Sequence, residues 1–418
     1  MRETSIRPPF IGLWRHNDFL KLWAAQTTSV FGTQLASLAY SLTAVLTLQA
    51  TPFQIGLLNA AGAASAALVG LFAGVIADRI RRRPILIGTD VGRAVIAATI
   101  PVAFAFGVLH IGHLYVARFL FGALSILSEV AYMAFLPSLV GREQLVEGNS
   151  KLSTTESVAS IAGPSLSGML VQALTAPIAI IVDVISFVFS AGFIWLIRTD
   201  EPEPQPAGKR RSVWAEIGEG LRVVFSNPIL RALSQGIALH FLFILIILTA
   251  FMVYAVRELS IEPVWLGIIL AAFGPGSLAG ALIAGRAATR FGLGRTMIAA
   301  TLLNALAAVL IPLARGSFTA IVSTLIAAHF LLAFGIQIHG INLMSLRQAI
   351  TPHRLQGRMN ASFRFINVCA MMIGALLAGV LGEVIGLRLT LTVGACGMFL
   401  PFVRLLLSPV RKLHEQPS

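Results

Sequence analysis

The sequence predicts an all-α membrane protein in which twelve transmembrane helices form two six-helix bundles. Its 418 residues are 56% hydrophobic and only 12% charged, and their mean hydropathy is +0.84, whereas about a quarter of the residues in a soluble domain are charged. Long apolar runs recur along the chain, and Lys and Arg gather in alternate connections between them. This composition excludes a disordered chain, which needs few apolar residues and high charge, and argues against an ordinary soluble enzyme.

The apolar runs of the first half are long enough to cross a bilayer, since a helical span needs about 20 such residues. Residues 22–77 contain no Asp, Glu, Lys or Arg, which leaves room for two spans joined by a turn at QATPFQ. Runs that include the uncharged stretches 94–117 and 157–182 supply four more. We therefore expect spans at 22–49, 53–77, 85–108, 112–136, 153–174 and 177–197.

The second half repeats this pattern. Uncharged runs at 232–256, 263–285, 296–314 and 316–346 predict four spans, and two weaker runs follow them. Helices are expected because they satisfy their own backbone hydrogen bonds in lipid, and because these runs lack the alternation of a β-barrel strand. The expected spans are 231–255, 264–285, 296–314, 318–345, 360–382 and 388–408.

Basic residues predict the orientation of these spans. One set of connections contains clusters such as Arg79 to Arg83, whereas the alternate set contains only Arg257, Arg315 and Arg388. Because cytoplasmic loops carry the excess of Lys and Arg, both termini are expected in the cytoplasm and the chain in the plasma (cytoplasmic) membrane. The same distribution explains the net charge of +13 without a nucleic-acid partner. No cleavable signal peptide is expected, because the first apolar run is too long.

The longest polar stretch divides the chain into two halves. Residues 198–228 begin with a charged, Pro-rich segment that is typical of a linker. The following SVWAEIGEGLRVVF is apolar at helical spacing, which predicts an amphipathic surface helix with Ser212 as its N-cap. The predicted organisation is an N-terminal bundle at 1–197, a cytoplasmic linker with an amphipathic helix at 198–229, and a C-terminal bundle with a short tail at 230–418.

The two halves also look like repeats of one another. GVIADRIRRR at 74–83 follows the second predicted span, and GRAATRFGLGR at 285–295 follows the eighth. Repeats of six plus six spans are typical of secondary transporters, whose substrate site lies near the middle of the membrane between the halves.

These motifs resemble those of the major facilitator superfamily. Gly74, Asp78, Arg79, Arg82 and Arg83 match its loop pattern after the second span, with Arg81 where the family usually has Gly, and Arg290 remains in the second half. Arg118 and Gly122 match the fourth-span pattern, and Gly163, Pro164 and Gly168 match the fifth-span pattern of antiporters. AFLPSLV at 134–140, DVISFVFS at 183–190 and TPHRLQGRMNAS at 351–362 are similar to the twelve-span drug:proton antiporter branch, which includes macrolide efflux proteins and the enterobactin exporter.

The resemblance implies roles for these motifs. The loop cluster of Gly74, Asp78, Arg79, Arg82, Arg83 and Arg290 would act as a cytoplasmic gate. For the arginine run the alternative is a plain topology signal that stops translocation. The segment Gly163, Pro164 and Gly168 would form a bend that seals antiporters against leak, against an incidental Pro kink.

Ionisable residues at lipid depth are costly, so each is a candidate for coupling transport to protons. The candidates are Asp90, Arg93, Arg118, Glu129, Glu156 and Asp183. Asp90 and Arg93 are three residues apart on one helix and can instead neutralise each other. A carboxyl group in this set can also remain neutral as a hydrogen-bond donor.

Polar and aromatic residues predict the lining of a substrate cavity. The candidates are Gln26, Gln34, Tyr40, Phe241, Tyr254, Gln337, His339 and Asn342, with Asn59, Phe251 and Met252 beside them. Packing inside a bundle is the alternative for each. His339 has no second ligand at helical spacing, so no metal site is expected and no cofactor other than the coupling proton.

Together these features predict a secondary active exporter that couples efflux of amphipathic small molecules, such as a drug, a macrolide or a siderophore, to protons by alternating access. The alternatives are a proton-coupled importer or uniporter of a sugar or small metabolite on the same fold, and a membrane-embedded enzyme, for which no catalytic motif is present. The expected partners are the lipid bilayer, the substrate and protons, without nucleic acid, and the chain is expected to be a monomer.

Overall fold

The computed structural model describes residues 12–199, 201 and 213–413, and within them the chain is helical and has no strand. Short helical turns lie at η1 (Leu13–Arg15), η2 (Thr43–Thr47), η3 (Arg142–Gln144) and η4 (Pro409–Lys412). The α-helices are α1 (Asn17–Leu42), α2 (Pro52–Arg79), α3 (Arg82–Ala105), α4 (Ile111–Leu139), α5 (Leu145–Leu174), α6 (Ala176–Ala179), α7 (Ile181–Trp195), α8 (Val213–Ser226), α9 (Pro228–Arg257), α10 (Pro263–Ala271), α11 (Phe273–Phe291), α12 (Leu293–Leu313), α13 (Phe318–Ile350), α14 (His353–Val384), α15 (Leu387–Gly397) and α16 (Phe399–Leu406).

The prediction of twelve membrane spans is confirmed. Among the described residues, 12 helical segments are long and apolar enough to cross a membrane. Three of these spans consist of two consecutive helices each, α6 with α7, α10 with α11, and α15 with α16. The chain is therefore a multi-pass membrane protein.

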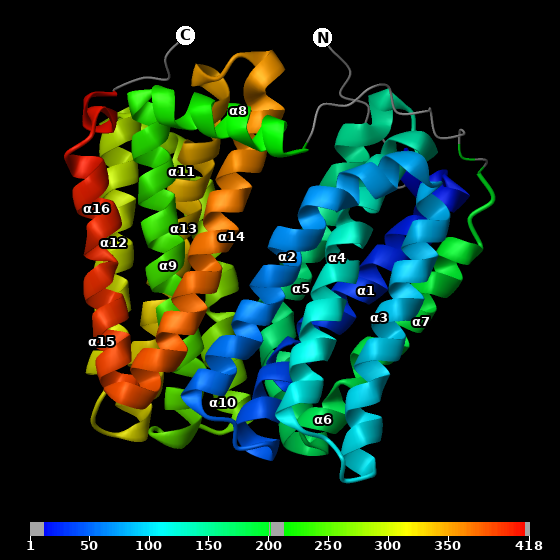
Figure 1. Cartoon of the computed structure of the whole chain (residues 1–418), viewed down its shortest axis with the longest axis horizontal. Coiled ribbons are helices and arrows are strands. Elements are labelled where there is room, and N and C mark those ends of the chain that lie inside the picture. The colour runs from blue at the N-terminus through cyan, green and yellow to red at the C-terminus, as the bar shows by residue number, and fades with distance from the viewer. Residues whose placement is uncertain (1–11, 200, 202–212, 414–418) are drawn as a thin grey trace, which may run out of the picture.

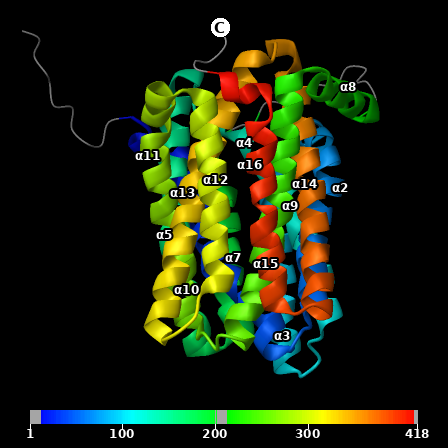
Figure 2. The same cartoon turned by 90° about the vertical axis from the view of Figure 1, so that its left-hand side faces the viewer.

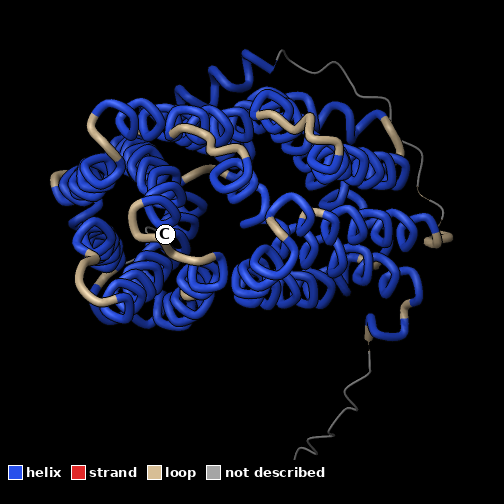
Figure 3. The backbone as a smooth tube through the Cα atoms, turned by 90° about the horizontal axis from the view of Figure 1, so that it is seen from below, coloured by secondary structure: helices blue, strands red, loops and turns tan. Residues whose placement is uncertain are grey.

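The helices form two bundles that lie side by side (Figures 1 and 3). Helices α1 to α7 form one bundle, here called the N-half, and α9 to α16 form the other, the C-half (Figure 1). The start of α1, the end of α16 and α8 lie at one end of the molecule, called the terminal face (Figure 1). The opposite end, the far face, holds the connections between α3 and α4 and between α12 and α13 (Figures 1 and 2).

Local capping explains several helix starts. In the predicted turn at QATPFQ, the Thr51 hydroxyl accepts a hydrogen bond from the Gln54 N–H, and the Gln54 side chain accepts one from the Thr51 N–H. This reciprocal capping box, with Pro52 in the first helical turn, starts α2 without leaving two N–H groups unpaired. Asn227 caps α9 in a similar way, with Pro228 behind it.

Some helices extend beyond the predicted spans at the terminal face. Helix α5 begins at Leu145, eight residues before the predicted start at 153, and α14 begins at His353 rather than at 360. The prediction followed the apolar runs alone. Polar residues such as those of LVEGNSKL continue a helix into the aqueous phase once its apolar part is fixed in lipid.

The structure has a helix, α8, in the part of the linker where an amphipathic helix is predicted, whereas the expected N-cap, Ser212, lies outside the described residues. Val224 is fully buried in the apolar core of the C-half. A Cβ atom at Gly220 would lie 2.5 Å from the backbone oxygen of Arg358, so only glycine allows this close approach of α8 to α14. The Arg358 guanidinium also pairs with Glu219. Helix α8 is therefore attached to the C-half.

The apolar cores show how the two halves meet. One cluster combines residues of both halves near the far face, such as Leu42 and Ile55 with Phe251 and Leu266. Near the terminal face the clusters separate. One contains only buried residues from Leu13 to Ile197, and another contains only buried residues from Val224 to Val410. The two halves are therefore packed together near the far face and diverge toward the terminal face (Figure 1).

Candidate functional site

Two cavities of about 540 Å³ each lie where the halves diverge, and Ser125 of α4 lines both. The first, called the polar cavity, is enclosed by N-half residues alone. The second, called the interface cavity, is enclosed by α1, α2 and α4 on one side and by α9, α10 and α14 on the other. Each volume is within the range of roughly 300–1,000 Å³ that holds a drug-sized ligand.

The walls of the interface cavity differ in chemistry. The N-half contributes hydroxyl and amide groups and the guanidinium of Arg118, interspersed with apolar side chains such as Ile55, Phe121 and Ile126. The C-half wall is apolar except for Thr249, and consists of Leu245, Leu248, Phe251, Met252, Leu270, Val368 and Met371. The Asn59 side chain donates a hydrogen bond to the Thr249 hydroxyl across the halves at 3.1 Å. The cavity therefore suits a ligand with one polar and one apolar side.

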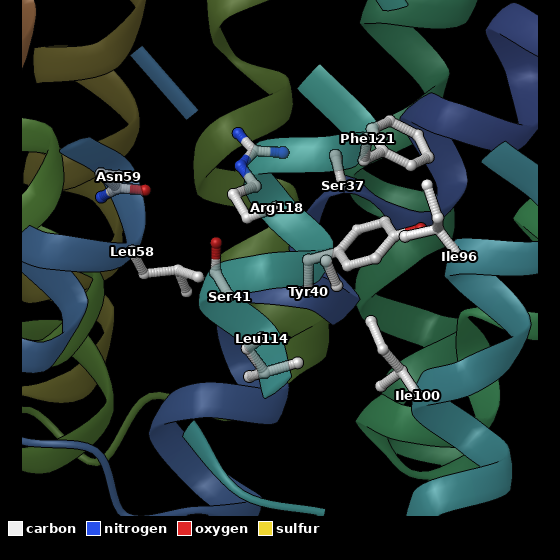
Figure 4. A pocket seen from close by; sticks show the side chains of 11 residues that line it. Ser37, Tyr40, Ser41, Leu58, Asn59, Ile96, Ile100, Leu114, Arg118 and Phe121 are labelled. Carbon is white, nitrogen blue, oxygen red and sulfur yellow. The ribbon is translucent and has the colours of Figure 1, made fainter. Parts of the chain in front are cut away.

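Arg118 is the cation of this cavity. It projects between Asn59 on one side and Tyr40 and Phe121 on the other (Figure 4), and it also lines the interface cavity. A Cβ atom at Gly62 would lie 3.1 Å from the Arg118 Nε, so a glycine on α2 leaves room for the guanidinium. Among the described residues, no carboxylate lies within 4 Å of it. Because guanidinium stays charged, this group is available to an anion or a hydrogen-bond acceptor.

Asp183 occupies a fully buried position on α7. Its carboxylate accepts a hydrogen bond from the Tyr40 hydroxyl at 2.9 Å and one from the Thr33 hydroxyl at 3.2 Å. Tyr40 lines the small pocket that contains Arg118 (Figure 4). A chain of polar groups thus leads from the small pocket of Arg118 through Tyr40 to a buried carboxyl group.

Asp90 and Arg93 pair with each other, as their spacing on the helix allows. The Arg93 guanidinium donates to Asp90 and to the Ser128 hydroxyl, the latter at 3.1 Å. The Ser190 hydroxyl donates to the other Asp90 oxygen at 2.6 Å, and the Phe187 ring lies 4.3 Å from the guanidinium carbon. The pair thus ties α3 to α4 and α7.

Replacing Asp90 with Asn is expected to destabilise the protein, because it leaves the buried Arg93 charge without its partner, at a cost of about 3–5 kcal/mol. The double change Asp90→Leu with Arg93→Met removes both charges and should restore part of the loss. The unfolding temperature of each variant in detergent, monitored by fluorescence-detected gel filtration, measures this loss of stability and its recovery. Glu156→Gln, on the polar cavity, is the matched control. An unchanged unfolding temperature for Asp90→Asn would contradict a neutralising pair.

Glu129 and Glu156 both line the polar cavity. Glu129 also forms an ion pair with Arg364 of α14, with 3.4 Å between the two charged groups. The two side chains are 46% and 54% exposed, and they belong to different halves. This pair is a direct electrostatic connection between the halves at the cavity.

The segment with Gly163, Pro164 and Gly168 lies within α5, which continues unbroken through Pro164. A Cβ atom at Gly163 would lie 2.5 Å from the Gln34 Cβ on α1. A Cβ atom at Gly168 would lie 3.2 Å from the Gly267 Cα on α10, and it would come still closer to the Pro263 carbonyl oxygen. The segment thus packs α5 against α10 of the other half. The role of a seal against leak stays a prediction.

Arg82 and Arg83 of the proposed gate contact the start of the linker and their own half. The Arg82 and Arg83 N–H groups donate to the Glu201 carboxylate at 2.7 and 3.1 Å. The Arg83 side chain donates to the Ile194 carbonyl at 3.2 Å and to the Trp195 carbonyl.

Among the described side chains of the other gate residues, neither Arg79 nor Arg290 forms an ion pair with the other half. Arg79 is exposed at the end of α2, and Arg290 lies over its neighbour Phe291 at 5.6 Å. Gly74 and Asp78 are in α2, but their surroundings lie outside the described part. The gate stays a prediction for a state in which the terminal face is closed.

Only part of the predicted lining reaches the cavities. Gln26 and Gln34 line the polar cavity, and Tyr40 lines the pocket of Arg118. Asn59, Phe251 and Met252 line the interface cavity. Phe241, Tyr254, Gln337, His339 and Asn342 line neither the polar nor the interface cavity.

In this conformation these five positions pack within the C-half, and their place in a substrate cavity stays a prediction. Tyr254, only 2% exposed, lies in the apolar core near the far face, and Phe241 packs against the same core. The Asn342 amide donates to the Ile338 carbonyl of its own helix at 2.8 Å. His339 is buried, and Gln337 faces Gly280 of α11. Polarity alone does not tell a cavity from a contact between helices.

Ser125, Ser128 and Tyr132 were not predicted as cavity residues. They lie on α4 with Arg118 and Glu129, at the three- and four-residue spacing of one helix face. This spacing was a signal in the sequence that could have identified the face. Among the described residues, no group of three or more His, Cys, Asp or Glu side chains is placed to hold a metal ion.

Related proteins match nearly the whole chain. It is 27% identical over 399 residues to the MFS-type transporter YfiS of Bacillus subtilis (strain 168), covering 95% of this chain and 94% of the relative. It is 25% identical over 420 residues to the enterobactin exporter EntS of Citrobacter koseri, covering 96% and 94%.

Solved transporter structures share the fold. A bacterial homologue of the lysosomal transporter Spinster, in an inward-facing and unoccupied conformation, matches with a TM-score of 0.71 at 13% identity and covers 97% of this chain and 100% of that one. The nucleoside transporter NupG matches with a TM-score of 0.71 at 12% identity, covering 94% and 98%. A bacterial homologue of the iron transporter ferroportin, in an inward-facing state, matches with a TM-score of 0.66 at 16% identity, covering 94% and 98%.

The family itself is given by the sequence profile described as transmembrane secretion effector, which matches residues 9–418. The match confirms the superfamily that the motifs predicted, and it makes the chain a transporter rather than an enzyme. The chain belongs to the transmembrane secretion effector family of the major facilitator superfamily.

Proposed function

We propose that this transporter is a secondary active exporter, which moves amphipathic small molecules out of the cell in exchange for protons. The interface cavity is the observation that carries the proposal. It places the Arg118 charge and several hydroxyl groups opposite an apolar wall of the other half. A relative of similar length is named an enterobactin exporter, which supports the outward direction.

The terminal face is proposed to be the cytoplasmic side of the plasma membrane. Lys and Arg gather in the connections at this face, as the excess of basic residues in cytoplasmic loops requires. The divergence of the halves toward this face then corresponds to an inward-facing state, ready to take a substrate from the cytoplasm or the inner leaflet. Two solved structures of the same fold are also described as inward-facing.

Substrate binding follows from the two walls. The apolar part of the substrate would contact Leu248, Phe251 and Met371, and its polar or anionic group would contact Arg118. Such contacts bridge the halves, so an occupied cavity favours their approach at the terminal face. The far-face packing then opens and the substrate leaves. Alternating access of this kind is typical of transporters built from two repeats.

In this proposal two carboxyl groups couple the movement to protons. Asp183 takes up a proton from the pocket of Arg118 through the Tyr40 hydroxyl. Protonation of Glu129 removes one charge of its pair with Arg364 and so weakens the attraction between the halves. A proton that enters from outside would thus reset the transporter. Asp90, whose carboxylate is already held by Arg93 and Ser190, is assigned a structural role.

Everted membrane vesicles test the direction of transport. With an acidic interior, an exporter takes up substrate and dissipates the internal proton gradient, whereas a proton-coupled importer or a uniporter does not. Chemically diverse amphipathic compounds are screened while internal pH is followed by a fluorescent dye. The export proposal is wrong if no compound is taken up by everted vesicles and if right-side-out vesicles instead take up a sugar or a nucleoside.

Changing Glu129 to Gln, or Arg364 to Gln, is expected to slow proton-driven transport several-fold without unfolding the protein, because an exposed ion pair contributes only about 0–1 kcal/mol to stability. The charge swap Glu129→Arg with Arg364→Glu restores the pair and should recover much of the rate. Initial uptake rates in vesicles measure this. If the swap is as slow as the single variants, the attraction between the two groups does not drive the step.

A further inference from the structure

A groove on the outer surface of the C-half lies away from both transport cavities. It has a volume of about 620 Å³ between α12 and α16, near the terminal face. Helices α12 and α16 are on the side of the C-half that faces away from the N-half (Figures 1 and 2). In a membrane this side is in contact with lipid, so the groove is open to the bilayer.

The walls of the groove change from charged to apolar along its length. Arg295, Arg411 and Lys412 lie at its end near the terminal face, with Leu406 at the adjoining end of α16, and Ile298, Leu302 and Phe402 continue it toward the middle of the helices. On α12, Leu302 follows Arg295 by seven residues, which places its Cα roughly 10 Å deeper along the helix axis. This order matches the change from the headgroup region to the hydrocarbon core of a bilayer.

The three cations are held at this end by the packing of η4 on the start of α12. The Gly294 N–H donates to the Leu413 carbonyl at 2.9 Å. Any side chain at Gly294 would collide with the Val410 carbonyl, and Val410 itself is fully buried. The Ser408 hydroxyl accepts a hydrogen bond from the Val410 N–H at 3.2 Å. Arg411 and Lys412 are thus placed beside Arg295 by the fold.

Within the described part of the chain, no negative charge balances these cations. None of its carboxylates lines the groove, and none of Arg295, Arg411 and Lys412 has an ion pair there. Three like charges at one site repel one another, and the amino-terminal end of α12 adds a partial positive charge. An anion bound here would relieve the repulsion.

We propose that this groove binds one anionic phospholipid. Its phosphate contacts Arg295, Arg411 and Lys412, and an acyl chain lies along Ile298, Leu302 and Phe402. Basic pockets beside transmembrane helices attract anionic headgroups by their charge. The apolar continuation of the groove distinguishes a phospholipid from free phosphate, because only the lipid fills both parts.

Native mass spectrometry of the detergent-purified full chain tests the site. Phosphatidylglycerol and phosphatidylcholine are added at equal concentration, and retained lipid is counted per protein. Phosphatidylglycerol should be retained at least about tenfold better than phosphatidylcholine. The triple variant Arg295→Gln, Arg411→Gln, Lys412→Gln should lose this preference. Arg222→Gln, which removes an exposed cation of α8, is the matched control and should keep it.

A second variant tests whether lipid retention depends on the shape of the groove or only on its positive charge. Ala299 is exposed and lines the groove, so Ala299→Phe fills it with all three cations intact and should lower retention of phosphatidylglycerol. The proposal is overturned if both lipids are retained equally, if the triple variant retains phosphatidylglycerol like the natural chain, or if Ala299→Phe has no effect. Displacement of the lipid by inorganic phosphate at low millimolar concentration would also overturn it. Variants are compared only where gel filtration shows a single folded species.

Discussion

Arg118→Gln is expected to abolish concentrative efflux while leaving the protein folded. The guanidinium has no carboxylate within 4 Å among the described residues, so its removal leaves no buried anion without a partner. A substrate acceptor group, by contrast, loses a charged hydrogen bond worth roughly 1.5–3 kcal/mol. This corresponds to an affinity loss of roughly 10- to 150-fold.

Substrate binding to the purified variant, together with uptake in everted vesicles, measures this effect. Arg118→Lys retains the charge but not the planar fork, and is expected to lie between the natural chain and Arg118→Gln. The position of Arg118 between the two walls of the cavity would have no functional meaning if Arg118→Gln bound and transported substrate at the natural level.

Gly168→Leu is expected to disrupt the contact between the halves near the far face and to stop transport. The two facing atoms are backbone atoms, the Pro263 carbonyl oxygen and the Gly267 Cα, which cannot turn aside as a flexible side chain can. Overpacking of such a site costs about 1–3 kcal/mol or more. Because this contact joins α5 to α10, the cost falls on the state in which the far face is closed.

Gly192→Leu is the matched control for this change. A Cβ atom at Gly192 meets no heavy atom within 4 Å, so the added side chain enters lipid and transport should continue. Transport rate and thermal stability are measured for both variants. A Gly168→Leu protein with the natural transport rate would show that close packing at this position is not required.

The spans were predictable because membrane helices are local features. A run such as 22–77 has no charge and enough length for two spans, and the structure has its helices there. The boundaries at the terminal face were not predictable in the same way, since α5 begins in the polar segment at Leu145. The length of the membrane-spanning part of a helix depends on its apolar residues, whereas the position of its end depends on caps and packing outside the lipid.

The cavity was only partly predictable, for a different reason. In a membrane protein a polar side chain avoids lipid by facing either a cavity or a neighbouring helix, and both choices look the same in sequence. Gln34 faces the cavity, whereas Asn342 bonds to its own helix. The pair of Glu129 with Arg364 joins residues 235 positions apart. Such a pair follows from how the halves meet, which no local pattern contains.

The central claim is that the space between the two halves opens to the terminal face and to the far face in turn, and that substrate and protons drive this movement. Two single cysteines test it, each in a background with Cys369 and Cys396 replaced by Ser. Ser153→Cys is on the polar cavity, and Ala375→Cys replaces a buried residue on α14 that packs against Gly56 of α2. Labelling by a membrane-impermeant maleimide is measured from each side of proteoliposomes.

Without a gradient, Ser153→Cys should react from the side of the termini and Ala375→Cys should be protected. With substrate on the side of the termini and an acidic far side, Ala375→Cys should become reactive from the far side as the labelling of Ser153→Cys falls. Unchanged labelling of both positions under these conditions would contradict alternating access as described.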